Sequence, residues 1–223
     1  MTLTQGTTTA TNPNPNATSY TIAHNHSGTN DAYLFVFCTM DRYRTYTGCT
    51  YNGVSMTQFH TYDWTTEGQR AVVYSLKDPD AGNNNIVLSF GGGLQQRSMV
   101  FYAQSFTGCG GLGVDGRDNT ATTPNSKSLT VVENSVIIAT GISTNSQSNP
   151  YSIGGSNTVS KSNGTSYLKQ VEYHISNTPL DGVENVSTIC DFGSITNYRV
   201  EVKEGGGVSV QKKSGPFFQF IFQ

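Results

Sequence analysis

Two histidines separated by a single residue, His24 and His26, come nearest to a metal site in residue type and spacing. Side chains two positions apart in a β-strand point to the same face, so both imidazoles would be able to bind one ion. Around a threefold axis, three such pairs would enclose an axial metal. The alternative is a partly exposed edge strand without a ligand. We therefore predict no resident metal or other cofactor, and His24 and His26 are the candidates for a metal site of this kind.

A second candidate site is a sugar-binding one, formed by Tyr62, Asp63 and Trp64. These residues lie in the stretch His60–Glu67, which holds the only tryptophan and which we expect to be a loop. Aromatic rings in a loop can stack on a sugar while a carboxylate accepts hydrogen bonds from its hydroxyl groups. Loops at the end of a sandwich often carry binding sites. The alternative is that Trp64 closes the end of the hydrophobic core.

Acidic and amide side chains gather in two short segments, Asp78, Asp80, Asn83 and Asn84 in the first and Asp115, Asp118 and Asn119 in the second. Calcium prefers such oxygen-rich loops. Neither spacing matches a defined calcium loop, and Asp, Asn and Gly are ordinary turn residues. We expect turns at both places.

Catalytic motifs are missing from the sequence, which has no G-x-S-x-G, H-E-x-x-H or phosphate-loop pattern. A glycosidase needs two positioned carboxylates, and nothing in the sequence pairs the available glutamates, which include Glu133, Glu172, Glu184 and Glu201. The glycine-rich stretch Gly108–Gly113 has no helix after it, so we expect turns there. We predict a protein that is not an enzyme and has no catalytic residues.

The elements that must position these residues are β-strands, because short runs rich in Thr, Val and Tyr alternate with turn residues. Asn52-Gly53 between two such runs predicts a hairpin. The expected strands are Ser19–Asn25, Ala32–Asp41, Thr47–Tyr51, Ser55–His60, Arg70–Lys77, Asn85–Phe90, Ser98–Thr107, Ser128–Val132, Ser135–Ser143, Ser166–Ile175, Val186–Phe192, Tyr198–Lys203, Gly207–Gln211 and Pro216–Phe222.

This many strands without helices predicts an all-β fold, a two-sheet antiparallel β-sandwich of the jelly-roll kind with an extended N-terminal arm. Ser98–Thr107 is apolar at both alternating sets of positions, which indicates a strand covered on both faces, and Val136–Ala139 indicates a central strand. We expect one sandwich domain over residues 19–223, in which residues 144–163 form either a long loop or a boundary within it.

Residues 1–18 form the expected arm. Threonine, asparagine and the two prolines leave little to bury, so the arm becomes ordered only where something holds it, either neighbouring subunits or its own domain. The residues expected to bind a partner are Thr7, Thr8, Thr9, Asn12, Pro13 and Pro15. The arm has no basic residue and no apolar block, so we expect no signal peptide.

Composition narrows the classes of partner. Only 13% of the 223 residues are charged, against about 25% in an average domain, and the net charge of −2 argues against nucleic-acid and membrane-surface binding. No apolar run approaches the length of a spanning helix. The scattered Cys38, Cys49, Cys109 and Cys190 are expected to be reduced and packed as small apolar groups, although a Cys38–Cys49 bridge would also suit a hairpin.

Five segments appear in a recognisable order: Ala32–Phe37, Thr50–Thr57, Arg70–Pro79, Asn85–Phe90 and Tyr102–Gly108. This progression resembles a β-sandwich module of tailed-bacteriophage virion proteins that also occurs in bacterial surface proteins, and it covers about Ser19 to Ser143. Asn52 stands where that family usually has glycine. The resemblance implies no catalytic residues, and it implies structural, attachment or decoration roles.

From these observations we expect a structural protein of the virion, made in the host cytoplasm. The favoured role is capsid decoration or cementing, with the major capsid protein or other virion proteins as partners and with a homo-oligomer, a trimer, as the expected state. The alternative is a head-fibre or tail adhesin that binds host-surface glycan through Tyr62, Asp63 and Trp64.

Overall fold

The computed structural model describes residues 2–11, 13, 17–28, 30–41, 45–64, 69–92, 99–120, 125–143, 152–153, 170–175, 180–188 and 195–205. All regular structure in these ranges is β-strand, and every strand pairing is antiparallel. The predicted all-β class is therefore confirmed. The jelly-roll description stays a prediction.

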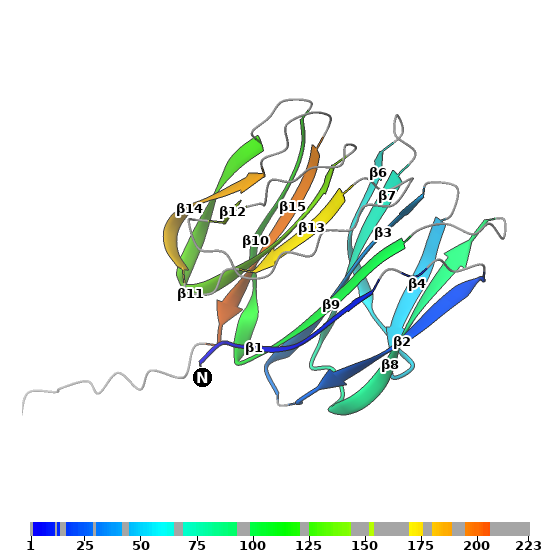
Figure 1. Ribbon diagram of the computed structural model, residues 1–223. Coiled ribbons are helices and arrows are strands. Elements are labelled where there is room, and N and C mark those ends of the chain that lie inside the picture. The colour runs from blue at the N-terminus through cyan, green and yellow to red at the C-terminus, as the bar shows by residue number, and fades with distance from the viewer. Residues whose placement is uncertain are drawn as a thin grey trace, which may run out of the picture.

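The strands form three sheets, called A, B and C here (Figure 1). Sheet A has the order β1 (Thr4–Thr11), β9 (Met99–Thr107), β3 (Ala32–Asp41), β7 (Gln69–Lys77) and β6 (Thr57–Trp64). Sheet B has the order β2 (Ser19–His26), β8 (Gly82–Gly91), β4 (Thr45–Tyr51) and β5 (Val54–Ser55).

Sheet C is built from the second half of the chain. Its order is β10 (Cys109–Thr120), β15 (Ile195–Glu204), β11 (Asn125–Ser143), β14 (Leu180–Thr188) and β12 (Ser152–Ile153), with β13 (Gln170–Ile175) paired to β11 as well. The long β11 pairs with β14 through its first half and with β13 and β15 through its second half. The predicted central position of Val136–Ala139 is confirmed.

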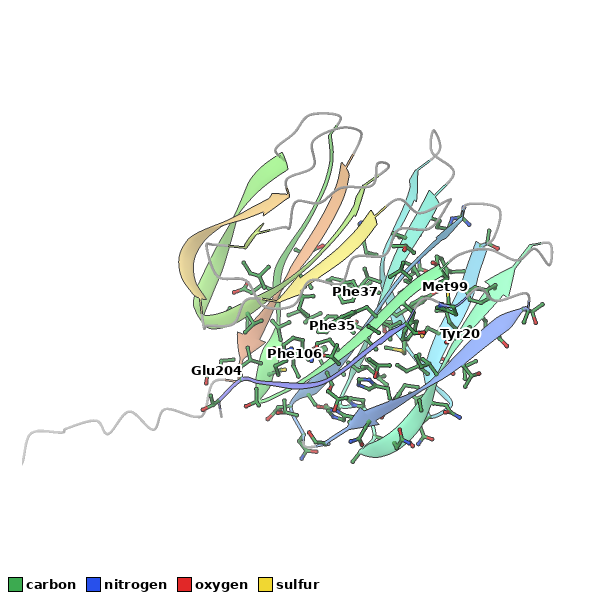
Figure 2. The ribbon with its side chains drawn as sticks, in the orientation of Figure 1. Tyr20, Phe35, Phe37, Met99, Phe106 and Glu204 are labelled. Carbon is green, nitrogen blue, oxygen red and sulfur yellow. The ribbon has the colours of Figure 1, made fainter. Side chains whose placement is uncertain are left out.

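Sheet A is the middle layer of the three. One of its faces packs on sheet B through a cluster that includes Leu34, Tyr51 and Phe101. Its other face packs on sheet C through a cluster that includes Phe35 and Val202, and Figure 2 shows Phe35, Phe37 and Phe106 between these sheets. The predicted two-sheet sandwich thus corresponds to sheets A and B, and sheet C adds a third layer.

Strand β9 shows why this layering follows from the sequence. Every residue from Met99 to Phe106 is buried, as the apolar residues at alternating positions on both faces predicted. Phe101 and Ala103 join the cluster on the sheet B side, whereas Tyr102 and Phe106 join the cluster on the sheet C side. A strand that is apolar on both faces needs a layer on each side.

The Asn52-Gly53 hairpin is confirmed. Tyr51 pairs with Val54 and Thr50 with Ser55, and both turn residues have positive φ, 49° at Asn52 and 78° at Gly53. These angles are those of a type I′ turn, which asparagine tolerates better than most side chains. The turn geometry therefore accommodates asparagine at position 52.

Several expectations from the sequence were wrong in detail. The stretch Gly108–Gly113 does not form turns beyond Gly108, because Cys109–Thr120 is strand β10. The expected strands Ser128–Val132 and Ser135–Ser143 are parts of the single strand β11. The expected strands Gly207–Gln211 and Pro216–Phe222 lie outside the described residues.

Candidate functional site

The segment expected to be an extended arm is held on the edge of sheet A. Residues Thr4–Thr11 pair with β9 from Thr4 opposite Thr107 to Thr11 opposite Phe101, and the register shifts between Gln5 and Thr8. Met99 N–H also donates to the carbonyl of Pro13 at 3.0 Å. We call the surface that receives β1 the arm seat; it comprises Phe101–Thr107 of β9 together with His24 of β2.

Gln104 is the polar centre of the arm seat, and its side chain is 0% exposed. Its Oε1 accepts hydrogen bonds from Thr8 Oγ1 at 2.5 Å and from Gln5 Nε2 at 3.3 Å. Its Nε2 donates to the carbonyl of Gly6 at 3.0 Å and to that of Ser105 at 2.8 Å. The amide therefore satisfies the backbone where the bulge in β1 interrupts the regular ladder.

The shape of the arm seat also restricts which residue can occupy position 6 of the arm. A Cβ added to Gly6 would lie 2.5 Å from Ser105 Oγ and 3.2 Å from its carbonyl oxygen. Ser105 Oγ in turn donates to the carbonyl of Thr7 at 3.4 Å. Because β1 approaches β9 this closely at the bulge, only glycine fits at position 6 without movement of its neighbours.

The histidine pair points into the protein from an edge strand. Strand β2 lies at the edge of sheet B and is partly exposed, as the alternative to a metal site expected, but its His24 and His26 are each 1% exposed. The arm covers His24, because Thr9 Oγ1 of β1 lies 2.9 Å from His24 Nδ1. The ring of Tyr51 packs edge-on against His24 with centroids 6.2 Å apart.

Burial also sets the protonation of this pair. Desolvation, with a smaller contribution from the charge of His26, lowers the pKa of His24 to about 4. Desolvation lowers the pKa of His26 as well. Three ring nitrogens, His24 Nε2 and both of His26, have no hydrogen-bond partner among the described residues. Both rings are therefore neutral at pH 7, and protonation of either ring would place a positive charge in the protein interior.

The arm residues singled out from the sequence divide into two groups. Thr7, Thr8 and Thr9 lie on β1, where Thr8 binds Gln104 and Thr9 contacts His24. Pro13 binds Met99 through its carbonyl, and Asn12 and Pro15 lie outside the described residues. The structure thus shows these threonines bound to their own domain. This is one of the two alternatives that the sequence left open, the other being binding to neighbouring subunits.

Tyr62, Asp63 and Trp64 lie on a strand and not in the expected loop. They form the end of β6, where Tyr62 pairs with Ala71, Asp63 with Arg70 and Trp64 with Gln69. Strand β6 is at the edge of sheet A opposite to β1. The two candidate sites of the sequence, the arm and the aromatic segment, are therefore separated by the width of sheet A.

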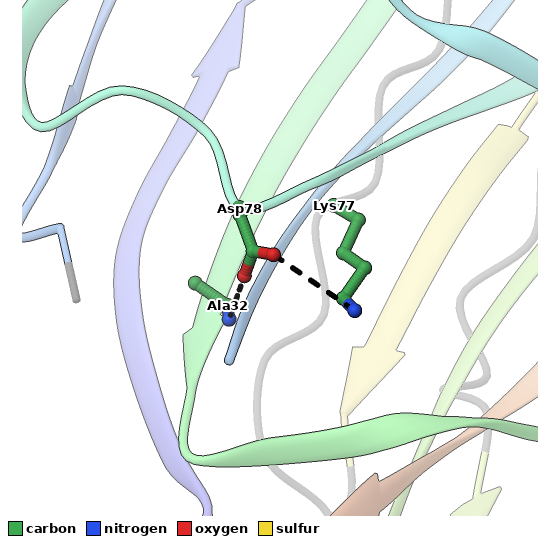
Figure 3. Close-up of polar contacts among 3 residues, drawn as sticks. All are labelled: Ala32, Lys77 and Asp78. Atoms are coloured by element: carbon green, nitrogen blue, oxygen red, sulfur yellow. Dashed lines mark hydrogen bonds and ion pairs between the residues drawn. The ribbon is translucent and has the colours of Figure 1, made fainter. Parts of the chain in front are cut away.

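The acidic segments have structural partners. Asp80 accepts from Asn52 Nδ2 at 2.9 Å, and Asn84 Nδ2 donates to the carbonyl of Ala81 at 3.1 Å. Asp78 accepts from Ala32 N–H at 3.1 Å and lies 3.9 Å from Lys77 Nζ (Figure 3). The first segment is thus a hydrogen-bonded turn leading into β8.

The second acidic segment, Asp115 to Asn119, is not a turn, because it lies within β10. In the part of the chain that the structure describes, no three His, Cys, Asp or Glu side chains come together as a metal site. His24 and His26 are thus a pair without a third such ligand in these ranges.

Two further buried polar groups were not expected from the sequence. Glu201 is buried in sheet C and accepts from Ser135 Oγ at 2.6 Å. A Cβ on Gly113 would collide with the Glu201 carboxylate, so this glycine makes room for a side chain and does not form a turn. The hydrogen bonds of Gln104 to the arm were not predicted either, because a lone glutamine in an apolar strand matches no motif.

Three cysteines, Cys38, Cys49 and Cys109, are free and buried. This confirms the expected packing for them, and Cys190 lies outside the described residues. Tyr46 OH donates to Cys38 Sγ at 3.1 Å, and Cys49 Sγ lies 3.4 Å from Met56 Sδ. Burial raises the pKa of Cys49 and of Cys109 to about 12, so neither thiol is ionised at pH 7.

Comparisons with family models, with curated proteins and with solved structures gave no match to this chain. The described residues include no helix with the length and apolarity needed to cross a membrane.

Proposed function

We propose that this chain is a non-enzymatic structural protein of a tailed-phage virion. Its role would be that of a decoration or cement protein that binds the outer surface of the capsid and stabilises the lattice. The partners would be the major capsid protein and further copies of the chain, in a trimer or another homo-oligomer.

The observation that carries the proposal is the correspondence between the resembling segments and one structural unit. All five segments fall on the strands of sheets A and B or on the turns that follow them: β3, β4 with β5, β7, β8 and β9. The resemblance is thus to a packed sandwich with a common core. A sandwich with low surface charge suits attachment through many weak contacts, which a lattice multiplies by avidity.

The arm supports the proposal in a second way. It is bound to sheet A by main-chain pairing, threonine hydroxyls and one amide, which is the chemistry of β-strand addition. Strand addition is a general way to join subunits without a large apolar surface.

An alternative function is glycan binding by a fibre or tail adhesin. The position of Tyr62, Asp63 and Trp64 at the end of an edge strand favours it, since an edge strand leaves one side open to a ligand. This function predicts sugar binding on a glycan array that Trp64→Ala abolishes. Unchanged binding by the variant would remove this site from consideration.

The deciding experiment measures copies of this chain per virion by quantitative mass spectrometry against the major capsid protein. Hundreds of copies would support a lattice component. A few to a few dozen would favour the adhesin, and absence from purified particles would refute both virion roles.

A further inference from the structure

The arm seat is built for one particular strand. Gly6 is the position at which a side chain would meet Ser105, and the bulge beside it is held by Gln104. Thr8 and Thr9 bind Gln104 and His24 through their hydroxyls. A strand of unrelated sequence would leave the buried Gln104 amide unsatisfied or place a side chain at the bulge, and both are costly. The partner strand that fits best is therefore this segment itself.

The same strand can fill the seat of its own chain or that of a second copy. Every contact between β1 and β9 is identical in the two arrangements, so their free energies differ only in the connecting segment and in the entropy of association. The β1 side chains add little to the hydrophobic core: only Ala10 of β1, with Leu3 just before it, packs on the cluster between sheets A and C. Withdrawal of the strand therefore leaves most of the core in place.

The connecting segment is short and contains two prolines. Between Thr11 at the end of β1 and Ser19 at the start of β2 the chain reads Asn-Pro-Asn-Pro-Asn-Ala-Thr. Proline fixes its own φ and biases the residue before it toward extended conformations. Sequences of this kind favour extended conformations, and an extended hinge is what exchange of a strand between copies requires.

We propose that copies of this chain exchange β1, so that Thr4–Thr11 of one copy occupies the arm seat of another. This deepens the assembly role proposed above, because it names the partner of the arm as a second copy of the chain and not the capsid protein. Exchange that closes on itself gives a dimer or a ring, and exchange that does not close gives a chain of subunits.

A disulfide between register partners tests the exchange. Thr4 and Thr107 lie opposite each other on β1 and β9, and neither is fully buried. The double variant Thr4→Cys, Thr107→Cys is refolded at a series of concentrations, oxidised and separated on a non-reducing denaturing gel. Mass mapping identifies the 4–107 cross-link among any links to native cysteines. We expect cross-linked dimers or larger species, whose share rises several-fold with a tenfold rise in concentration.

The matched control places the same cross-link where no exchange is proposed. Ser19 and Ser89 are register partners on β2 and β8, and both strands stay in the same sandwich under either arrangement. The variant Ser19→Cys, Ser89→Cys should give monomers with an internal disulfide at every concentration. Single variants at position 4 or 107 show what random collision produces.

Two outcomes overturn the exchange. One is a 4–107 cross-link found only within single chains at all concentrations. The other, which needs no engineered cysteine, is light scattering on the unmodified chain that shows only monomer over the same range. Either result combined with many copies per virion would reject exchange and leave the decoration function standing. Exchange found in a chain that is absent from virions would support exchange and reject the decoration function.

Discussion

Thr9 on β1 and His24 on β2 meet with 2.9 Å between the threonine hydroxyl and the imidazole Nδ1. The contact joins an edge strand of sheet A to an edge strand of sheet B, at the side where the sandwich would otherwise lie open. It explains why His24 is buried although it lies on an edge strand. It also couples the state of the arm to the protonation of the His24 ring.

Acid should destabilise the protein through this pair. The pKa of His24 falls from 6.5 to about 4 on folding, so between these pH values the unfolded chain binds a proton that the folded chain does not. The stabilisation by neutral His24 is complete above about pH 6.5 and is lost as the pH falls toward 4. The loss should be on the order of 3 kcal/mol, measured by urea unfolding across this window.

The control for acid sensitivity is His24→Gln, which cannot titrate. Carboxylates contribute to acid unfolding in both proteins, so the informative quantity is the difference between them at each pH. That difference should change steadily from pH 6.5 to pH 4 and then level off. A constant difference would show that His24 is not a source of the pH dependence.

The hydrogen bonds of Gln104 should make a large contribution to the free energy of unfolding, although its strand is otherwise apolar. Gln104→Leu keeps the volume but leaves the Gly6 carbonyl and the Thr8 hydroxyl without their partner. We expect a loss of about 2 to 3 kcal/mol in the free energy of unfolding. The exposed Gln58 on β6 is the matched control, and Gln58→Leu should change stability by less than about 0.5 kcal/mol. Equal effects of the two substitutions would show that the hydrogen bonds of Gln104 to the arm contribute nothing to stability.

Much of sheets A and B was predictable because their strands are short and separated by strong turn signals. The bounds of Ala32–Asp41 were predicted to the residue. The apolar residues on both faces of β9 predicted that this strand is covered on each side. The Asn-Gly pair identified its hairpin because few other dipeptides accept positive φ at both positions. These are local signals, and local sequence carries them.

The features that were missed depend on contacts distant in sequence. The sequence around Gly113 is typical of a turn, and only Glu201, far along the chain, shows that this glycine makes room for a carboxylate. The burial of His24 depends on β1, and the position of the arm depends on Gln104. In each case the structural role of a residue depends on a contact with a residue on another strand.

The β4–β5 turn gives a prediction that separates conformation from contact. Asn52→Gly should keep the positive φ and lose only the exposed hydrogen bond to Asp80, so stability should change by no more than about 0.5 kcal/mol. Asn52→Val places a β-branched residue at φ 49° and should cost about 1 to 3 kcal/mol. Gly48→Ala on β4 is the control, since a Cβ there meets nothing within 4 Å. Thermal unfolding of the three variants would rank them, and a glycine variant as unstable as the valine variant would contradict the turn assignment.

Adjacent residues on β3 test whether sheet C is an integral layer of the core. Leu34 and Phe35 are both fully buried, but Leu34 packs toward sheet B and Phe35 toward sheet C. Leu34→Ala should cost about 2 to 5 kcal/mol and Phe35→Ala about 3 to 5 kcal/mol, because each leaves a cavity between two packed sheets. Denaturant unfolding monitored by circular dichroism and by fluorescence gives both values. If Phe35→Ala cost less than about 1 kcal/mol while Leu34→Ala behaved as expected, sheet C would not be packed on sheet A in solution.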